Sequence, residues 1–206
     1  MKVLYIVTAF PRSDDDLITP WLVETIHRLQ AVGIDVEVLA PSYRGLDDQT
    51  VTDIRVHRFR YGPARWEDLT HDQTAPDRLR ARPLYAALLP SYLTAGTAAA
   101  VRLARSGRFS LLHVHWPLPH AAFGLAARAA SGLPLVLTFH GVELTWARRQ
   151  LPFLHPLLRR AIRSADAVTA NSSYTEAMIR ALHERPVIRI PFGATIAPPR
   201  PGPSGP

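Results

Sequence analysis

Short runs of apolar, often β-branched residues alternate along the chain with longer segments whose apolar residues recur every three or four positions. The runs have the length of buried strands, and the longer segments have the period of amphipathic helices. Seven strands are predicted, at 2–9, 34–41, 54–59, 111–116, 134–140, 165–171 and 186–192. Strands that alternate with helices form βαβ units, so the pattern predicts a doubly wound, mostly parallel α/β sheet of the Rossmann-like type.

Between the strands, the pattern also predicts where helices and irregular segments lie. A helix is predicted at 20–33, and a polar stretch at 60–82 is predicted to be irregular. The strand at 54–59 alternates between apolar and polar residues, so one of its faces is expected to be partly solvated. A late helix is expected to have Ser172 or Ser173 as its N-cap, since serine oxygens accept from the free amides of the first turn.

The length of 206 residues suits one domain, which we expect to span 1–195. Residues 196–206 are dense in Pro and Gly and cannot form a helix or an interior strand, so we expect a linker or tail there. The chain has no cysteine, which excludes disulfides and thiolate metal sites. The apolar run from Lys2 to Ala9 is short and is followed by Pro and acidic residues, so it predicts a first strand and not a secretory signal.

One long uncharged stretch, 83–101, approaches the length of a membrane span. Pro90 interrupts it and polar residues dilute it, so a buried or interfacial helix is predicted. The wider segment 77–93 places arginines before apolar side chains, an arrangement that suits an anionic membrane surface. The competing interpretation, that its leucines belong to the core, is nearly as strong. We therefore expect a cytoplasmic protein, with a peripheral position on the inner face of the cell membrane as one alternative.

Charge is distributed unevenly along the chain, whose formal net charge is +7. Residues 1–77 carry Lys2 and seven arginines against thirteen acidic residues, whereas 78–206 carry sixteen arginines against four. Such asymmetry can mark a surface that meets phosphates or anionic lipid. Since nearly all cations are arginine, we interpret most of this bias as compositional, and no nucleic-acid partner is predicted.

Ligands of open parallel sheets bind at the carboxyl ends of the strands, close to the point where strand order reverses. If the first and fourth predicted strands flank that point, the loops that follow the strands form the site. The polar and aromatic residues of these loops are Arg12, His115, Trp116, His120, His140, Glu143, Asn171 and Ser172. The first strand is followed by no glycine-rich fingerprint and the chain has no P-loop, which disfavours ordinary dinucleotide or ATP binding.

His140 is the strongest single candidate among these residues. It ends an apolar strand and precedes Gly141, which lets the backbone approach a ligand closely. Glu143 follows where the next helix should start, and a His and a carboxylate there suit hydroxyl groups and proton exchange near neutral pH. Glu143 could equally be structural. Trp116 is balanced between a stacking wall for a sugar and hydrophobic cover.

Two histidines share one face of the fourth strand, His113 and His115, and superficially resemble metal ligands. No acid or third imidazole stands at a fixed spacing nearby, so packed, hydrogen-bonded core histidines are the better interpretation and no metal site is predicted. The three acids Asp14 to Asp16 are interpreted as a solvated loop.

Three motifs in order resemble the N-terminal domain of glycosyltransferase family four. They are LLHVHW at 111–116, FHGVEL at 139–144 and ADAVTANSS at 165–173, and the opening MKVLYIVTAFPRS also resembles that family. The likeness covers nearly the whole chain, and the ordered set is more specific than any motif alone.

The resemblance implies one half of a GT-B enzyme that transfers a sugar from a nucleotide-sugar donor with retention and requires neither cofactor nor metal. It implies that this half holds the acceptor (a sugar, a lipid-linked group or another small molecule), lines the cleft with His115, Trp116, Gly141, Glu143 and Ser172, and places His140 beside the transferred sugar. The donor would be gripped by a C-terminal domain that is absent here, in the same or a separate chain. Two departures from the family pattern concern the donor: Arg12 stands in a loop that lacks the usual Gly-Gly turn and would have to supply charge to a diphosphate, and residues 191–195 read Pro-Phe-Gly-Ala-Thr.

Two other functions remain open at this point. One is a non-enzymatic carbohydrate- or lipid-binding module derived from the same fold. The other is a GT-B-like sugar-nucleotide epimerase, which would need several acids at the strand ends, where only Glu143 qualifies.

Overall fold

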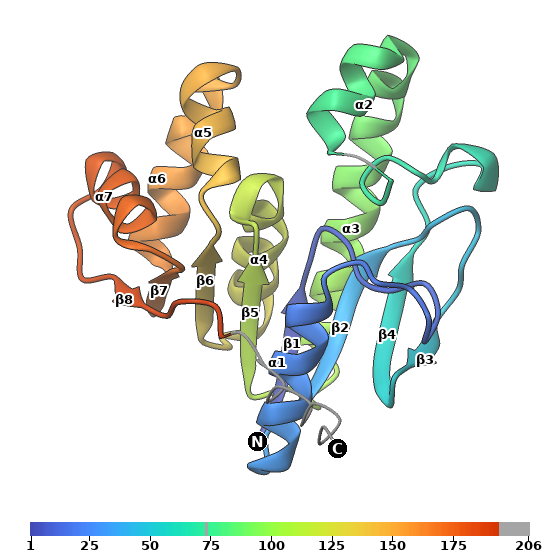
Figure 1. Cartoon of the computed structure of the whole chain (residues 1–206), viewed down its shortest axis with the longest axis horizontal. Helices are drawn as coiled ribbons and strands as arrows, with labels where there is room; N and C mark the ends of the chain where they lie inside the picture. The colour runs from blue at the N-terminus through green and yellow to red at the C-terminus, as the bar shows by residue number, and fades with distance from the viewer. Residues whose placement is uncertain (73, 194–206) are drawn as a thin grey trace, which may run out of the picture.

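A computed structural model describes residues 1–72 and 74–193, and the predicted linker at 196–206 lies outside these described residues. Eight strands form one sheet with the order β3-β4-β2-β1-β5-β6-β7-β8 (Figure 1). Their bounds are β1 Lys2–Ile6, β2 Asp35–Pro41, β3 Gln49–Val51, β4 Ile54–Phe59, β5 Leu111–His115, β6 Leu135–Phe139, β7 Ala167–Ala170 and β8 Ile188–Arg189. The mostly parallel α/β fold predicted from the hydrophobic pattern is confirmed.

Helices connect the strands as crossovers, which is why the sheet is parallel except at β3. The helices are α1 Pro20–Ala31, α2 Ala75–Ala81, α3 Leu89–Ala104, α4 Pro117–Ser131, α5 Val142–Arg149, α6 His155–Ser164 and α7 Ser173–Leu182. Short 3-10 turns lie at Ala64–Trp66, Pro83–Leu88 and Pro152–Leu154.

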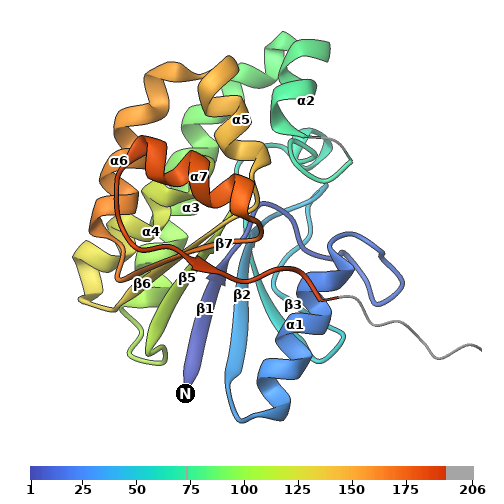
Figure 2. The ribbon, with the colours of Figure 1, turned by 60° about the vertical axis from the view of Figure 1, so that its left-hand side comes forward.

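Alternate residues of β1 point to opposite faces of the sheet and enter two separate hydrophobic clusters. Leu4 and Ile6 join the larger cluster, which the helices α3, α4 and α6 complete. Val3 and Tyr5 join the smaller one, which α1 covers on the opposite face. Figures 1 and 2 show α1 in front of β1 and β2 while α3 and α4 lie behind the sheet. The handedness of the crossovers explains this arrangement. The connection from β1 through α1 to β2 runs toward the β3 edge of the sheet, whereas the connections through α3, α4 and α6 run toward the β8 edge. Because right-handed crossovers in opposite directions place their helices on opposite faces, α1 lies on one face and the other three on the other.

After β8 the chain turns back across the α1 side of the sheet (Figure 2). The ring centroid of Phe192 lies 4.5 Å from that of Trp21 at the start of α1. The predicted strand at 186–192 is therefore mostly an extended crossing segment, and only Ile188–Arg189 pairs with β7.

Two expectations for the first half of the sheet differ from the structure. The short strand β3, which pairs antiparallel with β4, was not predicted, because three residues carry too little pattern to be recognised. β4 is buried almost throughout and has no solvated face. His57 lies 2.6 Å from a Glu37 oxygen, and the guanidinium of Arg58 donates to the carbonyls of Phe10 and Pro11, so polar partners replace water.

The uncharged stretch after residue 82 forms a 3-10 turn that continues into α3. By length and composition alone, the helical segment Pro83–Ala104 could cross a membrane, and 33% of its most apolar window is buried within the structure. Its buried side includes Tyr92, Ala100 and Leu103, which enter the larger cluster. Of the two alternatives predicted for this helix, buried or interfacial, the structure shows burial of one side, and the interfacial alternative stays a prediction.

Candidate functional site

The order of the strands reverses between β1 and β5. β1 pairs in parallel with β2 on one side and with β5 on the other, as expected for the first and fourth predicted strands. At such a reversal the two following loops diverge and leave a crevice at the carboxyl edge, the upper edge in Figure 1. This geometry makes the loops after β1, β5 and β6 the walls of the candidate site.

His140 lies directly after β6, at the base of this crevice. Gly141 follows with a φ of 98°, a conformation that side chains rarely adopt, and lets α5 begin at once. The imidazole is half-buried among aromatic rings: its centroid lies 4.4 Å from Trp116, 5.1 Å from Trp21 and 5.5 Å from Phe192. The sequence therefore placed His140 and Trp116 together correctly.

The protonation state of His140 differs from the expectation of exchange near neutral pH. Burial lowers the pKa of its imidazole to about 4, so the ring is neutral at pH 7. Its Nε2 lies 3.3 Å from Nδ1 of His115, and its own Nδ1 has no hydrogen-bond partner among the described residues. The His140 side chain is therefore an uncharged hydrogen-bonding group with a free Nδ1 among the described residues, and it is not a cation.

Glu143 is completely buried at the first turn of α5. Its Oε1 accepts from the backbone amide of His140 at 2.8 Å, while Oε2 has no partner among the described residues. Burial raises the pKa of this carboxyl to about 7, against the opposing effect of the amide hydrogen bonds. Glu143 thus holds the turn that carries His140, and it is the member of the pair that titrates near neutrality.

The two histidines of β5 have different partners. His113 Nε2 lies 2.6 Å from the hydroxyl of Thr138, which in turn lies 2.7 Å from the hydroxyl of Thr169. His115 is buried and its ring stacks at 5.5 Å on His140. The interpretation of these residues as packed, hydrogen-bonded histidines is confirmed.

Ser172 and Asn171 support the neighbouring turn. The Ser172 hydroxyl accepts from the amide of Thr175 at 3.2 Å, which confirms it as the N-cap of α7. Asn171 donates from its side-chain amide to the carbonyl of His140 at 3.1 Å. Asn171 therefore helps to fix the backbone at His140, whereas Ser172 fixes the start of α7.

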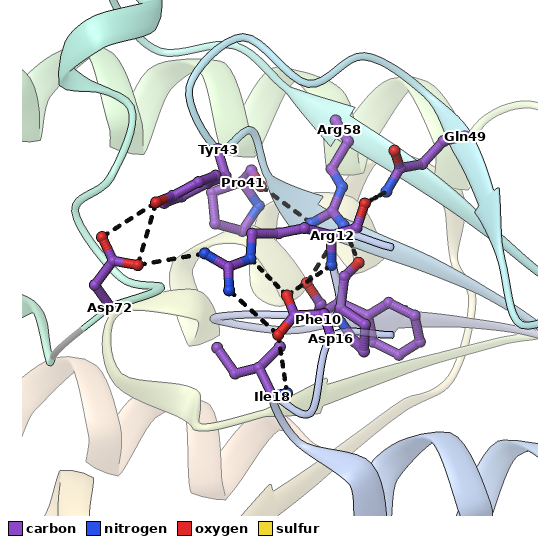
Figure 3. Close-up of polar contacts among 10 residues, drawn as sticks. Phe10, Arg12, Asp16, Ile18, Pro41, Tyr43, Gln49, Arg58 and Asp72 are labelled. Carbon is purple, nitrogen blue, oxygen red and sulfur yellow. Dashed lines mark hydrogen bonds and ion pairs between the residues drawn. The ribbon is translucent and has the colours of Figure 1, made fainter. Parts of the chain in front are cut away.

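Arg12 is placed apart from His140 and is already paired. Its guanidinium binds the carboxylate of Asp16 through two nitrogens and reaches Asp72 at 3.4 Å (Figure 3). Asp16 is therefore not a solvated acid, and the pKa of Arg12 is raised chiefly by this partner. Asp16 and Asp72 therefore compensate the positive charge of Arg12, which the sequence had predicted to contact a diphosphate.

Sequence reasoning missed three residues that shape the site. Trp21 and Phe192 enclose His140. His71 lines the neighbouring cavity from the stretch 60–82, which was predicted to be irregular but contains the helix α2. A weak signal for Trp21 was its position directly after Pro20, at the start of the predicted helix at 20–33. Phe192 stands in the segment 191–195, which was compared with the family pattern but not predicted to contact His140, and no motif marks His71, because both positions depend on how distant segments fold together.

Comparisons with known proteins agree with this geometry. The sequence model described as Glycosyltransferase Family 4 matches residues 21–196. An N-acetyl-alpha-D-glucosaminyl L-malate synthase from Bacillus anthracis is 32% identical over 97 residues, which are 46% of this chain and 24% of that protein. The match thus spans about a quarter of that curated relative.

Solved structures show the same fold at low identity. A sucrose-phosphate synthase structure from Thermosynechococcus elongatus superposes with a TM-score of 0.60 at 16% identity, over 94% of this chain and 90% of that one. A trehalose-phosphate synthase from Burkholderia vietnamiensis gives a TM-score of 0.54 at 13% identity, over 89% of this chain and 43% of that one. These comparisons lend no support to the epimerase or the non-enzymatic module.

Proposed function

Because this chain belongs to glycosyltransferase family 4 and has the fold of a GT-B N-terminal half, we propose that it forms the acceptor side of a retaining transferase that uses a nucleotide-sugar donor. The observation that carries the proposal is His140, which follows β6, the strand next to the strand-order reversal between β1 and β5, and whose Nδ1 has no hydrogen-bond partner among the described residues. The family motifs at 113–116, 140–143 and 166–172 meet at this one edge of the sheet.

His140 acts in this proposal as a neutral hydrogen-bonding group toward a hydroxyl of the transferred sugar. In the transfer, an acceptor oxygen bonds to the anomeric carbon while the bond from that carbon to the diphosphate oxygen breaks. The nucleoside diphosphate leaves with the electron pair and takes up the acceptor's proton. Trp116, stacked on the imidazole, keeps water from one side of His140, and Glu143 keeps its turn in place.

The donor is gripped by a second domain, in the same or a separate chain, and the transfer uses no metal. Support for this second domain comes from the trehalose-phosphate synthase, of which the chain covers 43%. The Bacillus anthracis relative is named for a glucosaminyl group and L-malate, which supports a hexosyl donor and a small-molecule acceptor as the first substrates to try.

The decisive experiment screens the complete enzyme, with its donor domain, against a panel of nucleotide sugars. Release of the nucleoside diphosphate is measured with and without candidate acceptors, and we expect one donor to be hydrolysed slowly and to be transferred rapidly once the acceptor is present. A product with inverted anomeric configuration, or turnover of the donor by epimerisation, would contradict the proposal.

We propose further that the segment before α3 rests on the cytoplasmic face of the cell membrane, where anionic lipid is abundant. Leu84 is 88% exposed beside the exposed Arg82, and Arg65 with the half-exposed Trp66 lines the same depression of about 390 Å³. Only part of this segment can contact lipid. The sequence had also predicted lipid contacts for its other basic and apolar residues, but three of them are buried: Arg78, Tyr85 and Leu88. A lipid-linked acceptor would be delivered at this surface.

A further inference from the structure

A cavity of about 360 Å³ opens at the carboxyl edge of the sheet, and His140 is not among its lining residues. Its walls come from the loop after β1, residues 69–71 and 74–75, and the N-terminal parts of α3, α4 and α5. Trp116 lines the cavity and stacks on His140 at 4.4 Å, so the two places share a wall. The volume suits a small-molecule group.

Charge is missing from this cavity. None of the described residues that line it is Asp, Glu, Lys or Arg. Burial lowers the pKa of His71 and of His120 to about 4, and the nearby Arg58 and Arg12 lower that of His71 further, so both rings are neutral. A carboxylate or phosphate bound here would lose its hydration without a cationic side chain in the lining to bind it, because Arg12 is paired with Asp16 and Asp72 and the guanidinium of Arg58 donates to backbone carbonyls.

Two polar groups of the cavity lack partners among the described residues. His71 is 7% exposed, and neither of its ring nitrogens forms a hydrogen bond; the hydroxyl of Thr19 is likewise unpartnered. His120 differs, because its Nε2 lies 2.9 Å from the hydroxyl of Tyr92 and its Nδ1 lies 3.4 Å from that of Thr8. Buried polar groups are nearly always satisfied, and a hydroxyl, which both donates and accepts, complements a neutral imidazole.

We propose that this cavity binds the acceptor, and that the acceptor is an uncharged alcohol with an apolar body. Its hydroxyl bonds to His71 and Thr19, while its body contacts Leu69, Leu89 and Trp146. The inference rests on the proposed function, since it assigns the substrate class of the same transfer, and it excludes dicarboxylates as acceptors.

The test compares two ligands that differ in one group, 4-phenylbutan-1-ol and 4-phenylbutanoate, with L-malate as a third probe. Binding to the full chain is measured by calorimetry and by tryptophan fluorescence, since Trp116 and Trp146 line the cavity. We expect saturable binding of the alcohol, binding of the carboxylate at least about tenfold weaker because its charge is desolvated without a partner, and no binding of L-malate.

Variants then locate the binding. His71→Phe should weaken the alcohol about tenfold through the lost hydrogen bond, whereas His27→Phe, at an exposed histidine, should leave it unchanged. Ala75→Phe fills the cavity and should abolish binding, and Ala87→Phe, at an exposed alanine, should not. Melting curves identify any variant that fails to fold, and the second pair decides if the first does not fold.

Several results would overturn the inference: equal or tighter binding of the carboxylate, saturable binding of L-malate, no saturable binding of the alcohol, or identical effects of each variant and its control. These failures are distinct from failure of the proposed function. If sugar transfer occurs but the alcohol does not bind, the acceptor class is rejected. If the alcohol binds but no nucleotide sugar is turned over, the transferase is rejected.

Discussion

His140 and Glu143 are three residues apart, yet burial moves their pKa values in opposite directions. Desolvation opposes charge, so it lowers the pKa of the imidazole to about 4 and raises that of the carboxyl to about 7. At neutral pH the site therefore contains an uncharged imidazole beside a carboxyl that is close to half-protonated. This neutral state fits the hydrogen-bonding role proposed for His140.

In the complete enzyme, His140→Ala should lower the transfer rate by about 10²–10³-fold, the usual cost of removing one positioned hydrogen-bonding group. The ratio of wild-type to variant rates should stay constant from pH 6 to pH 8, because the imidazole does not titrate in that range. Steady-state kinetics across this range are the measurement, with the exposed His27→Ala as control. Near-normal activity of the variant would remove His140 from the site.

The raised pKa of Glu143 predicts that the free energy of unfolding depends on pH. Its folded pKa is raised from the model-peptide value of 4.5 to about 7, so the folded chain keeps a proton that the unfolded chain releases in that range. Its contribution to stability is complete below pH 4.5 and is lost as pH rises through 7, amounting to about 3 kcal/mol at 1.36 kcal/mol per pKa unit.

Glu143→Gln should abolish this loss. We expect the free energies of unfolding of wild type and variant to be closest near pH 4.5 and to diverge in favour of the variant up to pH 7, with a constant difference above it. Urea unfolding at several pH values measures the difference, and Glu24→Gln at an exposed glutamate is the matched control. A difference that does not vary with pH would show that the carboxyl is not buried in the folded chain.

At single residues, the sequence located side chains better than it predicted their charge state. Strand period put His113 and His115 on one face, and the Gly after His140 marked the end of its strand, both from local geometry. Partners distant in sequence decided the rest: Arg12 was assigned to a phosphate, but Asp16 and Asp72 compensate it. Local pattern carries no information on which carboxylate a loop will fold against.

At the scale of elements, the segment from α2 to the start of α3 has two unlike sides. Tyr85 and Leu88 enter the core, whereas Leu84 and Leu93 face outward. The sequence could not separate these residues, because a 3-10 turn at Pro83–Leu88 interrupts the helical period and changes which positions share a side. The exposed side is the one available to lipid.

Charge reversal at this surface should weaken membrane binding. Arg82→Glu and Leu84→Ser together should reduce co-sedimentation with vesicles that contain phosphatidylglycerol by at least about tenfold, since each arginine near such a surface contributes roughly 1 kcal/mol. Arg105→Glu with Leu17→Ser, at an exposed arginine and a leucine that is 84% exposed, provides the matched control. Equal binding to neutral and anionic vesicles, or none, would remove the lipid role.

The strands themselves were predictable because each crossover imposes its own pattern. A buried parallel strand has a continuous run of apolar residues, whereas in the helix that follows apolar residues recur about every 3.6 positions. This contrast marked every strand except β3 in the sequence. The partial pairing of β8 was not recognised. Its sequence has the composition of a strand, but the chain leaves β7 after two residues to cross toward Trp21.

At the scale of the whole molecule, the helices are shared unequally between the two faces of the sheet. In the described part of the chain, α1 packs on one face with the smaller cluster, and the larger cluster unites α3, α4 and α6 on the other. Both clusters are continuous and include β1 at the centre of the sheet. The two clusters therefore bury a core on both faces of the sheet, and the loops after β1, β5 and β6 form the wall that the proposed function assigns to the interdomain cleft.

The chain of 206 residues is expected to fold alone but not to transfer sugar alone. Folding follows because the eight-stranded sheet already buries a core on both faces. Inactivity follows because the donor must be held against His140, and orienting two reactants is worth about 7–11 kcal/mol of the barrier. We expect one cooperative thermal transition for the purified chain, and no release of nucleoside diphosphate from any nucleotide sugar until a donor-binding partner domain is added. Its addition should restore turnover for wild type but only weakly for His140→Ala. Robust transfer by the isolated chain would contradict the two-wall cleft and would require a donor site within this domain.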